Sequence, residues 1–160
     1  MISEGRIKGL MLCLFTACVA IAIAAPAAFG FVNLDYSGHV KGASNTLVGF
    51  DVNRTGSGHR KVIGFLVSQI PYSCSDAPAG ATAGWRFDPR MRVQRDRTFQ
   101  GRGEWTGLPL DPVGRVSGKF RRGAIAVGDF KLRGELAGPG THCRTGLLEW
   151  RATKQEQPPA

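Results

Sequence analysis

The stretch THCRTGLLEWRA, Thr141–Ala152, is the last part of the chain with the pattern of a folded strand. It combines a cysteine, a Thr-Gly pair and a tryptophan, and only a polar tail follows. Leu148, Trp150 and Ala152 alternate with polar residues, which is the period of a strand with one buried face. We therefore expect a closing strand that buries Trp150 and is attached to a distant point of the chain through Cys143.

The chain after Gly30 has the same strand-like pattern, and no stretch shows the apolar spacing of an amphipathic helix. Its 22 glycines and 9 prolines favour many short elements joined by turns. Strands separated by frequent turns are typical of an antiparallel β-sandwich or a flattened β-barrel, here of seven to nine short strands. The expected strand segments are Leu34–Gly42, Thr46–Val52, Lys61–Ile70, Trp85–Pro89, Arg90–Gln94, Arg97–Trp105, Gly114–Gly123, Ala124–Leu136 and Leu147–Thr153. Trp85–Pro89 and Arg90–Gln94 are either two short strands or one strand broken at Pro89.

Two glycines in these segments predict irregular pairing. Gly64 interrupts an apolar run, which indicates either a strand buried on both faces or a bulge at Gly64. Gly128 lies where the apolar positions of Ala124–Leu136 change parity, which predicts a slip in the alternation. The tryptophans at positions 85, 105 and 150 supply the bulk for one core in a chain of 160 residues.

The first 27 residues have the pattern of an export signal. Arg6 and Lys8 precede an uncharged apolar run, Leu10–Ala25, and small residues follow it. The sequence predicts a signal peptide at 1–27, cleaved between Ala24 and Ala28, or an uncleaved membrane anchor. A single all-β domain at 28–153 and a disordered tail at 154–160 would follow.

A location outside the cytoplasm fixes the expected cysteine chemistry. Cys13 and Cys18 lie in the signal segment, so Cys74 and Cys143 remain as one pair in an oxidising compartment. A disulfide between them would close a loop of about 70 residues, and closing a loop of that length stabilises a fold by about 4 kcal/mol. A metal site is the alternative, but two cysteines and His142 do not supply four ligands.

From Tyr36 to Ala152 the chain resembles a type of small secreted bacterial all-β domain of unknown function. Its features are Y-x-G in the first strand, a cysteine after the third, G-x-F strands later and a last strand C-x-[ST]-G-x-x-x-W-x-A. The matching residues here are Tyr36, Gly38, Cys74, Gly118, Phe120, Cys143, Thr145, Gly146, Trp150 and Ala152. Arg144 departs from the acidic residue expected there. The resemblance implies a disulfide-bonded domain outside the cell and transfers no functional residues.

Arginines concentrate in the segment WRFDPRMRVQRDRTFQGR, and the formal net charge is +9. Planar guanidinium groups beside aromatic rings suit carboxylate, sulfate or phosphate groups. We expect this segment either to bind an anionic envelope polymer, glycan or lipid headgroup, or to form a charged edge that prevents strand-to-strand aggregation. The candidate anion-binding residues are Arg86, Arg90, Arg92, Arg95, Arg97 and Arg102.

No pattern of catalytic or metal-binding residues emerges, so we expect neither an enzyme nor a cofactor. The chain has no G-x-S-x-G motif, and His39, His59 and His142 are scattered without metal-ligand spacing. Asn53 matches a glycosylation sequon, which matters only in a eukaryotic secretory pathway. Nucleic acid is not expected as a partner.

Two further functional classes stay open at this stage. A closed ring of strands can carry a small apolar ligand in its lumen, as lipocalins do. That class requires space inside, which Phe50, Phe65, Phe120 and Trp150 would remove if they filled the lumen. The domain can also be a passive structural or partner-binding module of the cell envelope.

Overall fold

The computed structural model describes residues 34–107, 112–137 and 139–156, and these contain ten strands and no helix. The predicted signal segment, 1–27, and most of the predicted tail lie outside the described residues. β10 extends to Lys154, one residue beyond the predicted domain boundary. The strands are β1 (Tyr36–Val40), β2 (Ala43–Arg54), β3 (Arg60–Cys74), β4 (Gly80–Phe87), β5 (Met91–Arg92), β6 (Thr98–Gly107), β7 (Val113–Phe120), β8 (Ile125–Gly134), β9 (Cys143–Arg144) and β10 (Leu148–Lys154).

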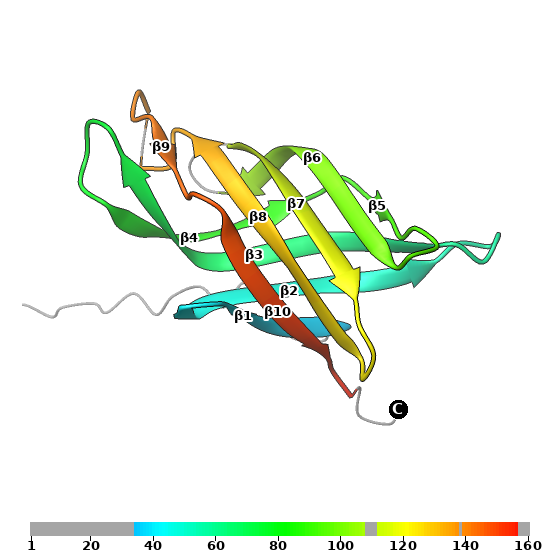
Figure 1. Cartoon of the computed structure of the whole chain (residues 1–160). Coiled ribbons are helices and arrows are strands. Elements are labelled where there is room, and N and C mark those ends of the chain that lie inside the picture. The colour runs from blue at the N-terminus through cyan, green and yellow to red at the C-terminus, as the bar shows by residue number, and fades with distance from the viewer. Residues whose placement is uncertain (1–33, 108–111, 138, 157–160) are drawn as a thin grey trace, which may run out of the picture.

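All pairings are antiparallel, and eight strands form a continuous ring. The order β10-β1-β2-β3-β4-β6-β7-β8 closes because β10 also pairs with β8. In Figure 1, β6, β7, β8 and β10 pass in front of β1, β2 and β3 at a steep angle, so the ring has two packed layers. The predicted antiparallel sandwich or flattened barrel is therefore confirmed, although β2 and β3, with 12 and 15 residues, are not short.

Aromatic side chains fill the space between the two layers. The ring centroids of Phe50 and Trp150 are 5.7 Å apart, and those of Phe65 and Trp150 are 5.4 Å apart. Phe120 lies 6.2 Å from Phe50 by the same measure, and all four residues belong to the buried core. Trp85 and Trp105 are buried as well, as the sequence predicts. These contacts place aromatic rings where an apolar ligand of a hollow barrel would lie.

The predicted slip of alternation at Gly128 is wrong. The pairing of β8 with both β7 and β10 is continuous through Gly128. Ala126 and Phe130 are buried, and a side chain at Gly128 would point toward the buried Trp150. Position 128 requires a glycine because the indole of Trp150 occupies the space that a side chain would need. The sequence pattern misled because glycine supplies no apolar signal at an inward-facing position.

The bulge predicted at Gly64 is confirmed. Gly49 pairs with Leu66 and Asp51 pairs with Ile63, so β3 holds one residue more than β2 across this step. Gly64 has φ of 58°, which glycine adopts without strain. The extra residue lets both Val62 and Phe65 face the core.

The predicted disulfide between Cys74 and Cys143 is also confirmed. Cys74 ends β3 and pairs with Cys143 in β9, while β9 pairs with β8 on its other side. The bond therefore ties the end of the third strand to the segment that leads into the closing strand.

Candidate functional site

The six arginines predicted to bind anions come from different parts of the fold. They are distributed over several elements, and Arg86 forms an ion pair with Asp88 at 2.7 Å. A guanidinium nitrogen of Arg92 lies 3.4 Å from a ring nitrogen of His59. Their places are β4 for Arg86, the chain before β5 for Arg90, β5 for Arg92, the β5–β6 turn for Arg95 and Arg97, and β6 for Arg102.

The β5–β6 turn has a structural organisation of its own. The Thr98 hydroxyl and backbone N–H both donate to Asp96 Oδ1, and these hydrogen bonds hold the pKa of Asp96 below its usual range. Arg97 has φ of 69°, and its N–H donates to the Gln94 carbonyl. Arg95 and Arg97 thus belong to a tight turn, whereas Arg102 lies within β6.

Arg102 instead lines a groove on the outer face of β6, β7 and β8, which we call the basic groove. The groove has a volume of about 1140 Å³, and the β9–β10 connection forms one of its walls. Its lining contains five cationic side chains and a single carboxylate. These are Arg102, Arg115, Lys131, Arg133 and Arg144, with Asp129.

Strand register places three of these cations in one row. Arg102 pairs with Arg115 across β6 and β7, and Arg115 pairs with Lys131 across β7 and β8. Neighbouring strands lie about 4.8 Å apart, so the row presents a positive charge at each strand. All three side chains are exposed to solvent.

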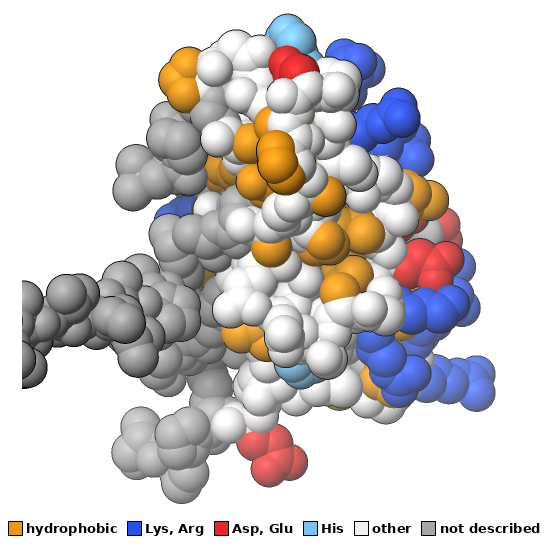
Figure 2. All heavy atoms as spheres, turned by 90° about the vertical axis from the view of Figure 1, so that its left-hand side faces the viewer, with side chains coloured by type: hydrophobic (Ala, Val, Ile, Leu, Met, Phe, Trp, Pro, Cys, Tyr) orange, Lys and Arg blue, Asp and Glu red, His pale blue; other side chains and the backbone are white. Residues whose placement is uncertain are grey.

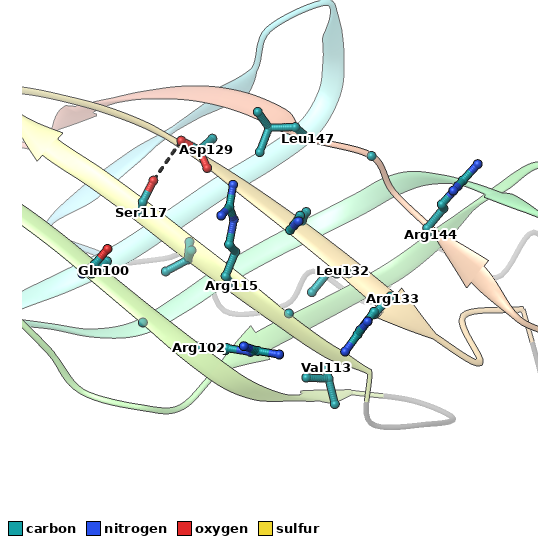
Figure 3. Close-up of a pocket in the computed structure, with 15 residues that line it drawn as sticks. Gln100, Arg102, Val113, Arg115, Ser117, Asp129, Leu132, Arg133, Arg144 and Leu147 are labelled. Carbon is teal, nitrogen blue, oxygen red and sulfur yellow. Dashed lines mark hydrogen bonds between the residues drawn. The ribbon is translucent and has the colours of Figure 1, made fainter.

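A second row lies two residues further along the strands. Glu104 pairs with Val113, Val113 pairs with Arg133, and Arg133 pairs with Arg144. Figure 3 shows the Arg102 and Arg133 side chains pointing toward one another, with Val113 below the space between them. The two rows together form a positively charged corner of the groove with an apolar side chain in its floor.

Few of the positive charges in the groove are balanced by nearby carboxylates. Asp129 accepts a hydrogen bond of 2.9 Å from the Ser117 hydroxyl, drawn in Figure 3. Within the part of the chain that the structure describes, the ion pairs are Lys41–Glu149 and Arg86–Asp88, and neither lies in the groove. Figure 2 shows Lys and Arg gathered along its right-hand edge, the side that faces the viewer in Figure 1.

A short arch before β10 forms the wall. Thr145 N donates to the Leu132 carbonyl at 3.1 Å, and Leu132 N donates to Thr145 Oγ1 at 3.0 Å. Gly146 follows with φ of 71°. The arch keeps the Leu147 side chain at the surface, where 55 % of it is exposed to solvent. The Thr-Gly pair of the closing segment thus shapes the groove, a role that sequence reasoning missed.

Sequence reasoning also missed four of the five cations. Their signal was present, since Arg115, Lys131 and Arg133 occupy outward positions of alternating strands. They come from separate stretches, however, and only the register of β6, β7 and β8 shows that they meet. A dense run of arginines in sequence was the more visible feature.

The histidines and metal-binding chemistry give no competing site. His39 lies in β1, while His59 and His142 lie in separate connections. Across residues 34–107, 112–137 and 139–156, no cluster of three or more His, Cys, Asp or Glu residues suits a metal ion. Over the same residues, no helix is long and apolar enough to span a membrane.

Comparison with known proteins yields no relative. No protein-family model, no curated protein and no solved structure matches the chain.

Proposed function

We propose that the protein is a binding module, not an enzyme, whose basic groove holds an extended anionic polymer. The observation that carries the proposal is the cross-strand row formed by Arg102, Arg115 and Lys131. Because like charges directly opposite on paired strands destabilise a sheet, such a row has a cost in the free protein. A bound polyanion offsets that cost by supplying several negative groups at once.

The chemistry of the cations favours oxyanions. Guanidinium groups form paired hydrogen bonds with carboxylate, sulfate or phosphate, and two arginines converge over Val113. An open groove on the face of a sheet accepts a long chain that continues beyond both ends. Small-molecule sites are instead typically concave and enclosed.

The other functional classes have less support. The aromatic rings between the two layers contact each other at the position where a carrier would hold an apolar ligand. The only observations that favour a passive envelope module are the packed core and the disulfide, which would stabilise any of these classes. We therefore propose the polymer-binding role alone.

We also propose that the polymer is met outside the cytoplasm. The pattern of residues 1–27 and the disulfide between Cys74 and Cys143 both support export, because disulfides persist in oxidising compartments. The intact mass of the protein recovered from its native host tests this, since cleavage near Ala24 to Ala28 and the loss of two hydrogens at the disulfide are both measurable.

The test compares two variants that lose the same charge. One carries Arg102→Gln, Arg115→Gln and Lys131→Gln in the basic groove. The control carries Arg90→Gln, Arg92→Gln and Arg95→Gln in the segment that the sequence favoured. Each is eluted from heparin resin by a salt gradient, after circular dichroism has shown that both remain folded.

The expected result is earlier elution of the groove variant, with the control close to the wild-type protein. Because both variants lose three positive charges, a general effect of net charge would shift them equally. Equal shifts, or an unchanged groove variant, would overturn the proposal. A larger shift of the control would move the site to the arginine segment.

A further inference from the structure

We infer that the polymer of the basic groove is an anionic polysaccharide, whose sugar rings contact Val113 and Leu147. This inference rests on the proposed polymer-binding role. It adds that the groove contacts the uncharged sugar rings of the polymer as well as its anionic groups. The argument begins from two exposed apolar side chains that lie among the cations.

Val113 is the first of these side chains. It occupies an outward position at the start of β7, with 38 % of its surface exposed. Its cross-strand partners are Glu104 and Arg133. The converging Arg102 and Arg133 side chains lie on either side of it in Figure 3. An anionic group held by both arginines therefore brings the adjoining part of the ligand onto Val113.

Leu147 is the second, on the wall formed by the β9–β10 connection. The hydrogen bonds between Thr145 and Leu132 fix the arch, so the leucine is held at the groove instead of folding into the core. It is the most exposed large hydrophobic side chain among the described residues. It lines both the basic groove and the neighbouring hollow around Glu149 and Arg151.

A polysaccharide that carries sulfate or carboxylate groups matches this combination. Each sugar ring presents C–H groups on its faces and bears its anionic groups at its rim. The faces can cover Val113 and Leu147, and removal of this apolar surface from water contributes to binding. A polymer of phosphate units alone satisfies the cations but leaves both apolar side chains exposed.

The test uses two polyanions and one matched control. The groove variant carries Val113→Thr and Leu147→Asn, which keep side-chain size while removing apolar surface. The control carries Leu47→Asn, because Leu47 is 36 % exposed on β2 and does not line the groove. Dissociation constants are measured for heparin oligosaccharides and for inorganic polyphosphate of similar charge.

The expected result is a loss of about tenfold in heparin affinity for the Val113→Thr/Leu147→Asn variant, which corresponds to about 1.4 kcal/mol shared by the two side chains. Polyphosphate affinity should change less than twofold, and Leu47→Asn should change neither. The variant with Arg102, Arg115 and Lys131 replaced by glutamine should lose affinity for both polymers.

Each other outcome is decisive. If the apolar variant weakens neither polymer, or both equally, while the charge variant weakens both, the polysaccharide inference fails and the polymer-binding role stands. If the charge variant weakens neither, the proposed function itself fails. If vesicles containing phosphatidylglycerol bind and they alone respond to the apolar variant, the ligand is a lipid surface and the inference is overturned.

Discussion

Trp150 lies directly across from Gly128 in the pairing of β10 with β8, and its indole covers the glycine. A side chain on Gly128 would begin 2.6 Å from Cζ2 of Trp150 and would also meet the Ser117 carbonyl. On the next strand Gly118 pairs with Gly128, and a Cβ there would lie 2.8 Å from the same indole atom. Two paired glycines thus make the space for the tryptophan of the closing strand.

We expect Gly128→Ala to destabilise the fold by about 2–3 kcal/mol, because the added methyl group forces Trp150 or the β7 backbone to move. Chemical denaturation followed by tryptophan fluorescence measures the change. Gly56→Ala is the control, since no atom lies within 4 Å of the position of its added Cβ. Equal stability of the two variants would contradict the packing described for Trp150.

Loss of the Cys74–Cys143 bond should lower the free energy of unfolding by about 4 kcal/mol, because the bond closes a separation of 69 residues in the unfolded chain. Urea unfolding of the double variant Cys74→Ser/Cys143→Ser checks this value. The wild-type protein unfolded with a reductant should match the variant. A variant as stable as the oxidised protein would show that β9 is held by strand pairing alone.

Replacing Thr145 by valine should loosen the arch that carries Leu147. The change removes the acceptor of the Leu132 N–H and should lower stability by about 1 kcal/mol. Thr145→Ser keeps the hydroxyl and serves as the control. Amide hydrogen exchange at Leu132 measures the effect directly, and unchanged protection in Thr145→Val would contradict the role given to this hydroxyl.

Tyr36 should contribute a pH dependence at alkaline pH. Burial raises the pKa of Tyr36 above its ordinary value, with a smaller opposing effect of Arg60 and a small addition from Asp35. The folded state therefore holds the phenol proton more tightly than the unfolded state. Its contribution is complete below the unfolded pKa of about 10 and is lost as the pH rises through the raised folded pKa.

The measurement for Tyr36 is urea unfolding between about pH 8 and 11 for the wild-type protein and Tyr36→Phe. The wild-type protein should lose more stability over this range than the variant. Tyr72 is present in both proteins and does not affect the comparison. Parallel decline of the two curves would show that the Tyr36 hydroxyl titrates alike in the folded and unfolded states.

The fold was largely predictable because its strongest signals are local. Alternation around Trp150, the glycine within an apolar run at Gly64 and the two cysteines outside the apolar N-terminal stretch each carry their meaning in a few residues. Gly128 was misread, because a glycine that accommodates a distant indole looks the same in sequence as one that permits a bulge.

The candidate site was much less predictable, because it depends on register. Arg115 and Lys131 become neighbours only when β7 and β8 pair with a particular alignment. Arg102 was identified as a candidate through its neighbours in sequence, yet its partners in the groove lie on other strands.

The pairing of Tyr36 with Lys154 joins the first strand to the last. This seam can form only after nearly the whole domain has been synthesised, whereas the β2–β3 and β7–β8 hairpins can form from nearby residues. Folds dominated by such remote pairings are slow to reach the native state. We expect the hairpins to gain hydrogen-exchange protection early in refolding, and the seam to be the last element to become protected.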